Sequence, residues 1–167
     1  MRKSLRFLVI ALVMISMMSC MVFADYSECT IINGTRYETE PNDVEDDATI
    51  LDYPLYGTIA DVADSDYYVY FSGATQTRTL RWGYNTSMNV AGAEGYLYLL
   101  DLTDDNLIYA QNISLSSSKT VQFNAIAGHI YIIEFNLNGP SDAIQDRLDY
   151  LYNLNGFGYR YVIRVAE

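Results

Sequence analysis

Short apolar runs separated by polar clusters fill most of the sequence after residue 54. The runs are rich in Tyr, Ile, Val and Leu, and clusters of Gly, Asn, Asp and Ser recur between them at roughly 10-residue intervals, which is typical of successive β-strands. The pattern predicts eight strands, at Leu55–Ile59, Asp66–Phe71, Thr77–Tyr84, Gly95–Leu102, Leu107–Ile113, Thr120–Ala125, Ile130–Leu137 and Tyr159–Val165. Eight short strands without a long helix favour an all-β fold, a two-sheet antiparallel β-sandwich of the jelly-roll-like kind.

The order of side chains within the strands indicates which faces are covered. In Thr120–Ala125, apolar side chains alternate with Thr, Gln and Asn, so we expect one face of this strand to be buried and the other exposed. In Tyr96–Leu100, the odd and the even positions are both apolar or aromatic, which suits a strand that is covered on both sides.

One segment departs from the strand pattern. Ser141–Asn153 begins with a residue that caps helices, and its Ala, Ile, Leu and Tyr side chains recur at a spacing close to that of a helix. We expect a short helix or an ordered loop here, within an insert at residues 138–157 that precedes the last strand.

The N-terminus has the order of regions that is typical of an exported protein. Basic residues precede an apolar run, Phe7–Met18, and the small residue Ala24 follows, which predicts a secretory signal peptide over residues 1–24. The run is short for a membrane span, and no later run is longer. A rival interpretation is a lipoprotein signal that leaves Cys20 lipidated. We favour ordinary export, to the medium or the cell surface, because an apolar Met-Val-Phe-Ala follows Cys20 instead of a polar tether.

Charge narrows the choice of partners. The chain has 10 Lys+Arg and 21 Asp+Glu, a formal charge of −11. Removal of residues 1–24 leaves 143 residues, enough for one domain, with 7 basic against 21 acidic residues and a formal charge of −14. Because affinity for nucleic acid depends on Lys and Arg at phosphates, we expect no nucleic-acid partner. An acidic surface is compatible with bound calcium or with a basic partner.

Acidic residues concentrate in one stretch. Glu38–Asp66 holds ten of the 21, and no Lys or Arg lies between Tyr37 and Thr77. A solvated acidic face is one interpretation, since like charges gather in exposed segments. A cation site is the sharper one, because closely spaced carboxylate and amide oxygens are the ligands that calcium prefers.

Three motifs follow one another in and just after this stretch. They are Glu-x-Glu-Pro-Asn-Asp at residues 38–43, Gly-x-Ile at 57–59 and Asp-x-Asp-x-Tyr-x-x-Phe at 64–71. Their order resembles the bacterial pre-peptidase C-terminal domain, a family similar to the collagen-binding domains of bacterial collagenases. The resemblance covers residues 38–167 as one domain and leaves residues 25–37 as an N-terminal arm. It implies a secreted, non-catalytic β-sandwich.

The resemblance also implies a calcium site. Calcium-binding members of the family draw ligands from the first motif and from acids just before the strand of the third. Carried over to this sequence, the ligands are Glu38, Glu40, Asn42, Asp43, Asp64 and Asp66. Collagen-binding relatives have an acid where this chain has Ala63, which leaves two alternatives: Asp64 substitutes for it, or the site is weak. One cation between the two clusters would cancel their repulsion and hold the N-terminal segment on the sandwich.

The sequence offers little for catalysis. His129 is the only histidine, at a turn before an apolar strand, and no Ser stands in a Gly-x-Ser-x-Gly elbow. Cys29 lies in the polar arm, far from His129 in sequence. We therefore favour a protein without enzymatic activity over the alternative, a small hydrolase that uses paired carboxylates.

Sixteen Tyr and one Trp suit half-buried strands, but such side chains also anchor polymers and protein partners. The predicted binding face is the run in which rare positive charges stand beside aromatic rings: Arg78, Arg81, Trp82 and Tyr84. We expect a binding or stabilising module for an extracellular polymer or protein, collagen-like or polysaccharide. The alternative is a structural or assembly protein of the cell envelope, anchored through Cys20 or paired through Cys29.

Overall fold

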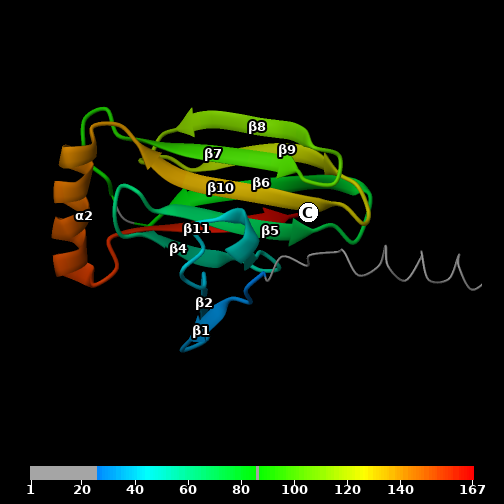
Figure 1. The fold of residues 1–167 in the computed structure, drawn as a ribbon, viewed down its shortest axis with the longest axis horizontal. Coiled ribbons are helices and arrows are strands. Elements are labelled where there is room, and N and C mark those ends of the chain that lie inside the picture. The colour runs from blue at the N-terminus through cyan, green and yellow to red at the C-terminus, as the bar shows by residue number, and fades with distance from the viewer. Residues whose placement is uncertain (1–25, 86) are drawn as a thin grey trace, which may run out of the picture.

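The computed structural model describes residues 26–85 and 87–167, so the predicted signal peptide and Cys20 lie outside the described residues. Strands dominate the fold, and one helix stands at one end of it (Figure 1). In chain order the elements are β1 (Thr30–Ile32), β2 (Thr35–Tyr37), the 3-10 helix η1 (Glu45–Asp47), β3 (Thr49–Ile50), β4 (Leu55–Ile59), β5 (Ser65–Phe71), β6 (Gln76–Tyr84), β7 (Glu94–Asp101), β8 (Asn106–Ile113), β9 (Lys119–Ala125), β10 (Ile130–Asn138), α2 (Ser141–Asn155) and β11 (Tyr159–Ala166).

The strands form two sheets, which confirms the predicted all-β sandwich. A six-stranded sheet has the order β1-β2-β4-β11-β6-β9, and a five-stranded sheet has the order β3-β5-β10-β7-β8. All eight predicted strands are present, with ends that differ by at most one residue. Two details differ from the prediction of eight antiparallel strands: the sheets are mixed, because β2 pairs with β4 and β3 with β5 in parallel, and β1, β2 and β3 are additional strands. Residues 25–37, for which an arm or a short edge strand was open, contain the hairpin of β1 and β2.

The core lies between the inner faces of the two sheets. In β9, Val121, Phe123 and Ala125 are buried while the residues between them are exposed, as the alternation predicts. Aromatic rings fill the middle of the core. The centre of the Trp82 ring lies 5.1 Å from the ring centre of Phe135 and 6.1 Å from that of Tyr161. Such pairs add to the free energy gained when large apolar side chains leave water.

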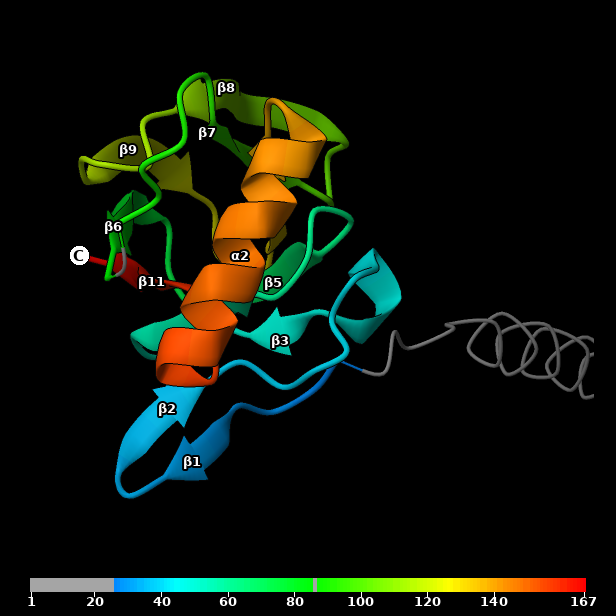
Figure 2. The ribbon, with the colours of Figure 1, turned by 90° about the vertical axis from the view of Figure 1, so that its left-hand side faces the viewer.

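Helix α2 closes one end of the sandwich (Figures 1 and 2). Ile144, Leu148 and Leu151 recur on one face of the helix and are buried against the core. The helix ends at Gly156, whose φ of 79° lies in the left-handed region and whose N–H donates to Tyr152 O at 2.7 Å. The predicted helix before the last strand is therefore confirmed. In the part of the chain that the structure describes, no helix has the length and apolar character of a membrane span.

The hairpin of β1 and β2 leads into the acidic stretch. Asn33 and Gly34 form its turn with φ of 52° and 80°, the backbone that a two-residue hairpin loop requires. β2 then joins the edge of β4 in parallel, with Tyr37 opposite Tyr56. The residue after β2 is Glu38, whose N–H donates to Tyr56 O at 3.0 Å. The edge of the six-stranded sheet thus fixes where the acidic stretch begins.

Candidate metal centre

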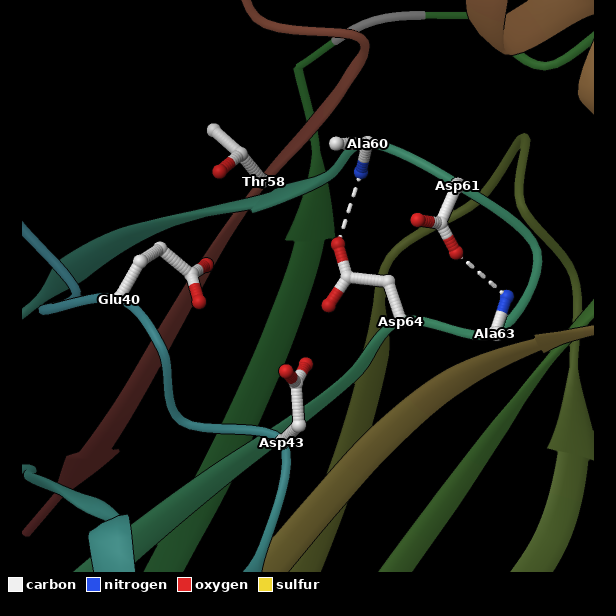
Figure 3. A pocket seen from close by; sticks show the side chains of 7 residues that line it. All are labelled: Glu40, Asp43, Thr58, Ala60, Asp61, Ala63 and Asp64. Atoms are coloured by element: carbon white, nitrogen blue, oxygen red, sulfur yellow. Dashed lines mark hydrogen bonds between the residues drawn. The ribbon is translucent and has the colours of Figure 1, made fainter.

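Two segments that are distant in sequence meet beside the start of β5. The first, residues 38–43, follows β2; the second, residues 60–66, comprises the β4–β5 connection (60–64) and the first two residues of β5. Asn42 O accepts a hydrogen bond from Tyr67 N at 3.0 Å, which fixes the first segment to β5. In Figure 3, Glu40 and Asp43 of the first segment point toward Asp64 of the second.

An outer group of three carboxylates faces a surface cavity. One oxygen each from Glu40, Asp43 and Asp64 lies within 4.8 Å of the others. The cavity has a volume of about 370 Å³ and is lined by Glu40, Asp43, Thr58, Ala60, Asp61, Ala63 and Asp64 (Figure 3). Asp64 Oδ2 accepts a hydrogen bond from Ala60 N at 2.8 Å, so the loop holds this carboxylate in place.

An inner group lies beneath the outer one and shares a member with it. Glu38, Glu40 and Asp66 each offer one oxygen within 4.8 Å of the others. Glu38 is 6% exposed and Asp66 is fully buried. Glu40 therefore links a buried pair of carboxylates to the solvent-facing group.

Two buried tyrosines hold the inner carboxylates. The Tyr68 hydroxyl donates to Glu38 Oε2, the Tyr161 hydroxyl donates to Asp66 Oδ2, and the two hydroxyl oxygens are 2.5 Å apart. Gly57 leaves the room that the rings need, because a Cβ there would lie against the Tyr161 ring and 2.5 Å from the Tyr68 hydroxyl. The sequence prediction missed both tyrosines. The glycine of the Gly-x-Ile motif, which marks a close approach to a strand, was the available signal.

The electrostatics of the site favour neutral carboxyl groups or a cation. Burial raises the pKa of Glu38 and the pKa of Asp66 well above the ordinary range of carboxyl groups, and their mutual charge raises the pKa of Asp66 further. Burial, followed by the charges of Glu40 and Asp43, raises the pKa of Asp64 to about 7. Burial also raises the pKa of Glu40. A nearby positive charge would favour the ionised form of all four groups.

The ligands on offer fit a hard cation. Both three-residue groups contain carboxylate oxygens only, with no nitrogen or sulfur ligand. Asp66 Oδ1 and Asn42 Oδ1 are buried and lack a hydrogen-bond partner among the described residues. Asn42 N donates to Glu40 Oε2 at 3.2 Å, so this residue is part of the same cluster. Oxygen-only ligands in this number suit calcium, which takes six to eight oxygens.

The structure brings together all five carboxylates that the sequence singled out as ligands. Glu38, Glu40, Asp43, Asp64 and Asp66 fall into the two groups. The neighbouring Asp61 belongs to neither group; its Oδ1 accepts from Ala63 N at 2.8 Å and shapes the loop.

The predicted binding face of Arg78, Arg81, Trp82 and Tyr84 is corrected by the structure. Successive strand residues point to opposite faces, so exposed Arg81 and the ring of Trp82, which is 1% exposed, lie on different sides of the sheet. Arg78 forms an ion pair with Glu167 at 3.3 Å, and Tyr84 is 43% exposed at the end of β6. The ring of Trp82 is therefore part of the core and is not available to a partner.

The contacts of His129 and Cys29 suit a structural role for both residues. His129 Nδ1 lies 2.8 Å from Asp101 Oδ2, a contact that ties the turn before β10 to the end of β7, and 4.0 Å from Asp104 Oδ2. The hydrogen-bond partner of the ring is thus a carboxylate, and among the described residues no serine hydroxyl or cysteine thiol is bonded to it. Cys29 is half-buried, carries a free thiol and packs against the core.

No protein-family model matches the chain, and no curated protein matches it. Among solved structures, it is similar to the pre-peptidase C-terminal domain of a collagenase from Bacillus anthracis, with 13% identity and a TM-score of 0.46 over 70% of this chain and 90% of that one. It is also similar to a family 35 carbohydrate binding module from an environmental isolate, with 13% identity and a TM-score of 0.37 over 65% of this chain and 69% of that one. A pre-peptidase C-terminal domain is thus among its structural neighbours, as the motifs at residues 38–71 predict. Likeness at this level does not say what the chain binds.

Proposed function

We propose that this chain is an exported, non-catalytic module in which the stretch Glu38–Asp66 binds calcium, and that the sandwich engages an extracellular polymer or protein. One observation carries the calcium proposal: two groups of carboxylates from separate segments share Glu40, and in the inner group the buried Asp66 Oδ1 has no hydrogen-bond partner among the described residues. The expected ligands are the carboxylates of the two groups together with the Asn42 amide oxygen.

Calcium at this site would act on stability. Five carboxylates close together repel one another, and the cost is largest for buried Glu38 and Asp66. A divalent cation offsets that repulsion and links residues 38–43 to the loop before β5. It would thereby hold the β1–β2 hairpin and the N-terminal segment on the sandwich. We expect a dissociation constant in the extracellular range of ~10⁻⁴–10⁻³ M.

The non-catalytic part of the proposal is supported by how the candidate catalytic groups are used. Glu38 and Asp66 are closed off from solvent and bound by tyrosine hydroxyls, so neither reaches a substrate. The ring of His129 is bound to Asp101, and among the described residues no serine or cysteine side chain is bonded to it as a nucleophile would be. Export is supported by the order of regions at the N-terminus, described above.

The test is a thermal melt of the full chain in chelator and in calcium at about 100 times the dissociation constant, where binding to the folded state alone adds ~2.7 kcal/mol. For a domain of this size we expect Tm to rise by roughly 5–15 °C. Asp64→Asn should remove most of the rise because this residue faces the cavity. Exposed Asp52→Asn, outside both groups, is the matched control and should keep it. An equal shift in both variants, or no shift in the parent chain, would overturn the calcium proposal.

A further inference from the structure

Charge is divided between the two sheets of the sandwich. The strands of the six-stranded sheet contain no Asp or Glu, and they hold six of the chain's 10 basic residues: Arg36, Arg78, Arg81, Lys119, Arg160 and Arg164. The strands of the five-stranded sheet contain no Lys or Arg, and they hold Asp66, Glu94, Asp101 and Glu134. In a chain with a formal charge of −11, one sheet is therefore entirely free of acidic side chains.

The outer face of this sheet carries a basic cavity. Strand pairing places Arg81 of β6 directly opposite Arg164 of β11 and opposite Thr120 of β9. The cavity has a volume of about 330 Å³ and is lined by Arg81, Trp82, Gly83, Ser118, Lys119, Thr120, Val162 and Arg164. None of these residues is acidic. Gly83 contributes no side chain to its floor, and Ser118 and Thr120 offer hydroxyl groups.

The two central arginines have no carboxylate partner within the described residues. The ion pairs there involve Arg78 with Glu167 and His129 with Asp101 at the end of β7 and Asp104 of the next turn, and none includes Arg81 or Arg164. Like charges directly opposite each other on neighbouring strands are destabilising. A chain with 21 acidic residues could have compensated them at little cost. Two unpaired guanidinium groups instead present forked donors, which match carboxylate and sulfate groups.

A third cation continues the face along β11. Arg160 lies four residues before Arg164 on the same face, a separation of about 13 Å at the rise of a strand. Its guanidinium carbon lies 5.8 Å from the ring centre of Tyr37 and 5.5 Å from that of Tyr56. Positive charges therefore recur along this face, with Val162 between Arg160 and Arg164 on β11 and with aromatic rings packed against Arg160.

We propose that the outer face of the six-stranded sheet, centred on Arg81 and Arg164, binds the acidic groups of an extracellular polysaccharide. This inference rests on the proposed binding module and names its surface and its class of ligand. Anionic sugars carry carboxylate or sulfate groups spaced by neutral rings, which matches cations that are spaced along the face, with aromatic rings beside Arg160. Nucleic acid matches less well, since its charges lie about 1.7 Å apart along the axis and would meet the acids elsewhere on the chain.

The experiment measures binding of the full chain to polygalacturonate, which carries carboxylates, to heparin, which also carries sulfates, to neutral dextran and to duplex DNA. At ~50 mM salt we expect binding to at least one acidic polysaccharide and not to dextran, with weakening at ~300 mM salt because charges are screened. The double variant Arg81→Gln/Arg164→Gln should bind at least about tenfold more weakly, as expected when two charge-assisted contacts are lost. Asn106→Asp/Gln111→Glu, at exposed positions of β8, changes the net charge by the same amount and should stay within about twofold.

The outcomes distinguish sulfate from carboxylate as the group that is bound, and they test the polysaccharide inference separately from the calcium proposal. Binding to heparin alone assigns sulfate, and binding to polygalacturonate assigns carboxylate. Equal binding to DNA, failure of both acidic polysaccharides, or an equal loss in the β8 variant overturns the inference. A calcium melt of Arg81→Gln/Arg164→Gln that keeps the parent shift shows that the fold and the calcium site are intact. If the acidic polysaccharides fail while that shift persists, only the polysaccharide inference falls.

Discussion

Two regions of this molecule contain clusters of like charge, one acidic and one basic, and the two clusters differ in burial and in their hydrogen-bond and ion-pair partners. Around Glu38 and Asp66 the carboxylates are buried, bonded to tyrosine hydroxyls and close enough to raise one another's pKa. Around Arg81 and Arg164 the guanidinium groups lie on an outer sheet face without intramolecular ion pairs in the described chain.

The difference indicates what each region does. Repulsion between buried charges acts at low effective dielectric constant, so it weighs on the stability of the fold and is relieved by a cation or a proton. Repulsion between exposed charges is screened by water and costs little, so the groups stay available to a ligand. The acidic region should therefore respond mainly in stability, and the basic region mainly in binding.

The largest effect should come from Gly57→Ala. The added Cβ would meet the Tyr161 ring and the Tyr68 hydroxyl, so one ring must leave its carboxylate. Overpacking of this kind costs about 1–3 kcal/mol, and we expect a lower Tm together with loss of the calcium shift. Gly73→Ala is the matched control, because a Cβ there meets no atom within 4 Å. Equal Tm values for the two variants would show that the tyrosines do not depend on Gly57.

Tyr161→Phe should have the next largest effect. It removes the hydrogen bond to Asp66 Oδ2 and leaves both oxygens of a fully buried carboxylate without a partner in the described residues. We expect a loss of about 1–3 kcal/mol in chelator, measured by urea unfolding, and a smaller loss in calcium. Tyr84→Phe, at a ring that is 43% exposed, should change stability by less than about 0.5 kcal/mol. A loss that is the same with and without calcium would separate the tyrosines from the cation.

Stability in chelator and the stabilisation added by calcium should depend on pH in opposite directions. The pKa of Asp64 is about 7 in the folded chain against 3.8 in the unfolded one, so the folded state binds more protons between these values. In chelator its contribution to stability is present in full below pH 3.8 and is lost as pH rises through 7. Calcium competes with the proton on Asp64. Protonation of this group should therefore lower the apparent affinity of the site for calcium by at most about tenfold for each pH unit below pH 7.

Thermal melts at pH 5 and pH 8 check both directions. In chelator, Tm should be higher at pH 5, where Asp64 is protonated, than at pH 8, where Asp64 is ionised. The rise in Tm caused by calcium should instead be larger at pH 8. Asp64→Asn should flatten both trends, since its side chain does not titrate. A calcium shift that is equal at both values in the parent chain would show that Asp64 holds no proton in competition with the ion.

The sequence predicted the elements whose signal is local. The apolar runs located eight strands to within one residue, and the periodicity of Ser141–Asn153 located α2. The strands β1, β2 and β3 have only two or three residues each, too few for a clear apolar pattern. The turn at Asn33 and Gly34 is a local signal for the β1–β2 hairpin, but the parallel pairing of β2 with β4 and of β3 with β5 depends on tertiary contacts that a local pattern does not contain.

The candidate sites divide in the same way. Short spacing of the acids within residues 38–43, together with the family resemblance for Asp64 and Asp66, pointed to the candidate metal centre. The tyrosines that hold its inner carboxylates come from β5 and β11 and required the sandwich to bring them together. The sequence prediction placed Trp82 on a surface because it follows Arg81. In a strand, however, Trp82 shares a face with Leu80, two residues before it, and that face is buried. Arg164 escaped notice because its cross-strand partner is 83 residues away in sequence.

The smallest effect, and the one that most sharpens the comparison, is that of Arg81→Gln on stability. If Arg81 and Arg164 only repel each other across β6 and β11, the substitution should leave the free energy of unfolding unchanged or raise it by up to about 0.5 kcal/mol. Urea unfolding at ~20 mM and ~300 mM salt checks this, because the gain should shrink when salt screens the pair. A loss above about 1 kcal/mol at either salt concentration would reveal an intramolecular partner for Arg81. In that case, the basic face would be a structural feature like the acidic one, and the difference between the two regions would disappear.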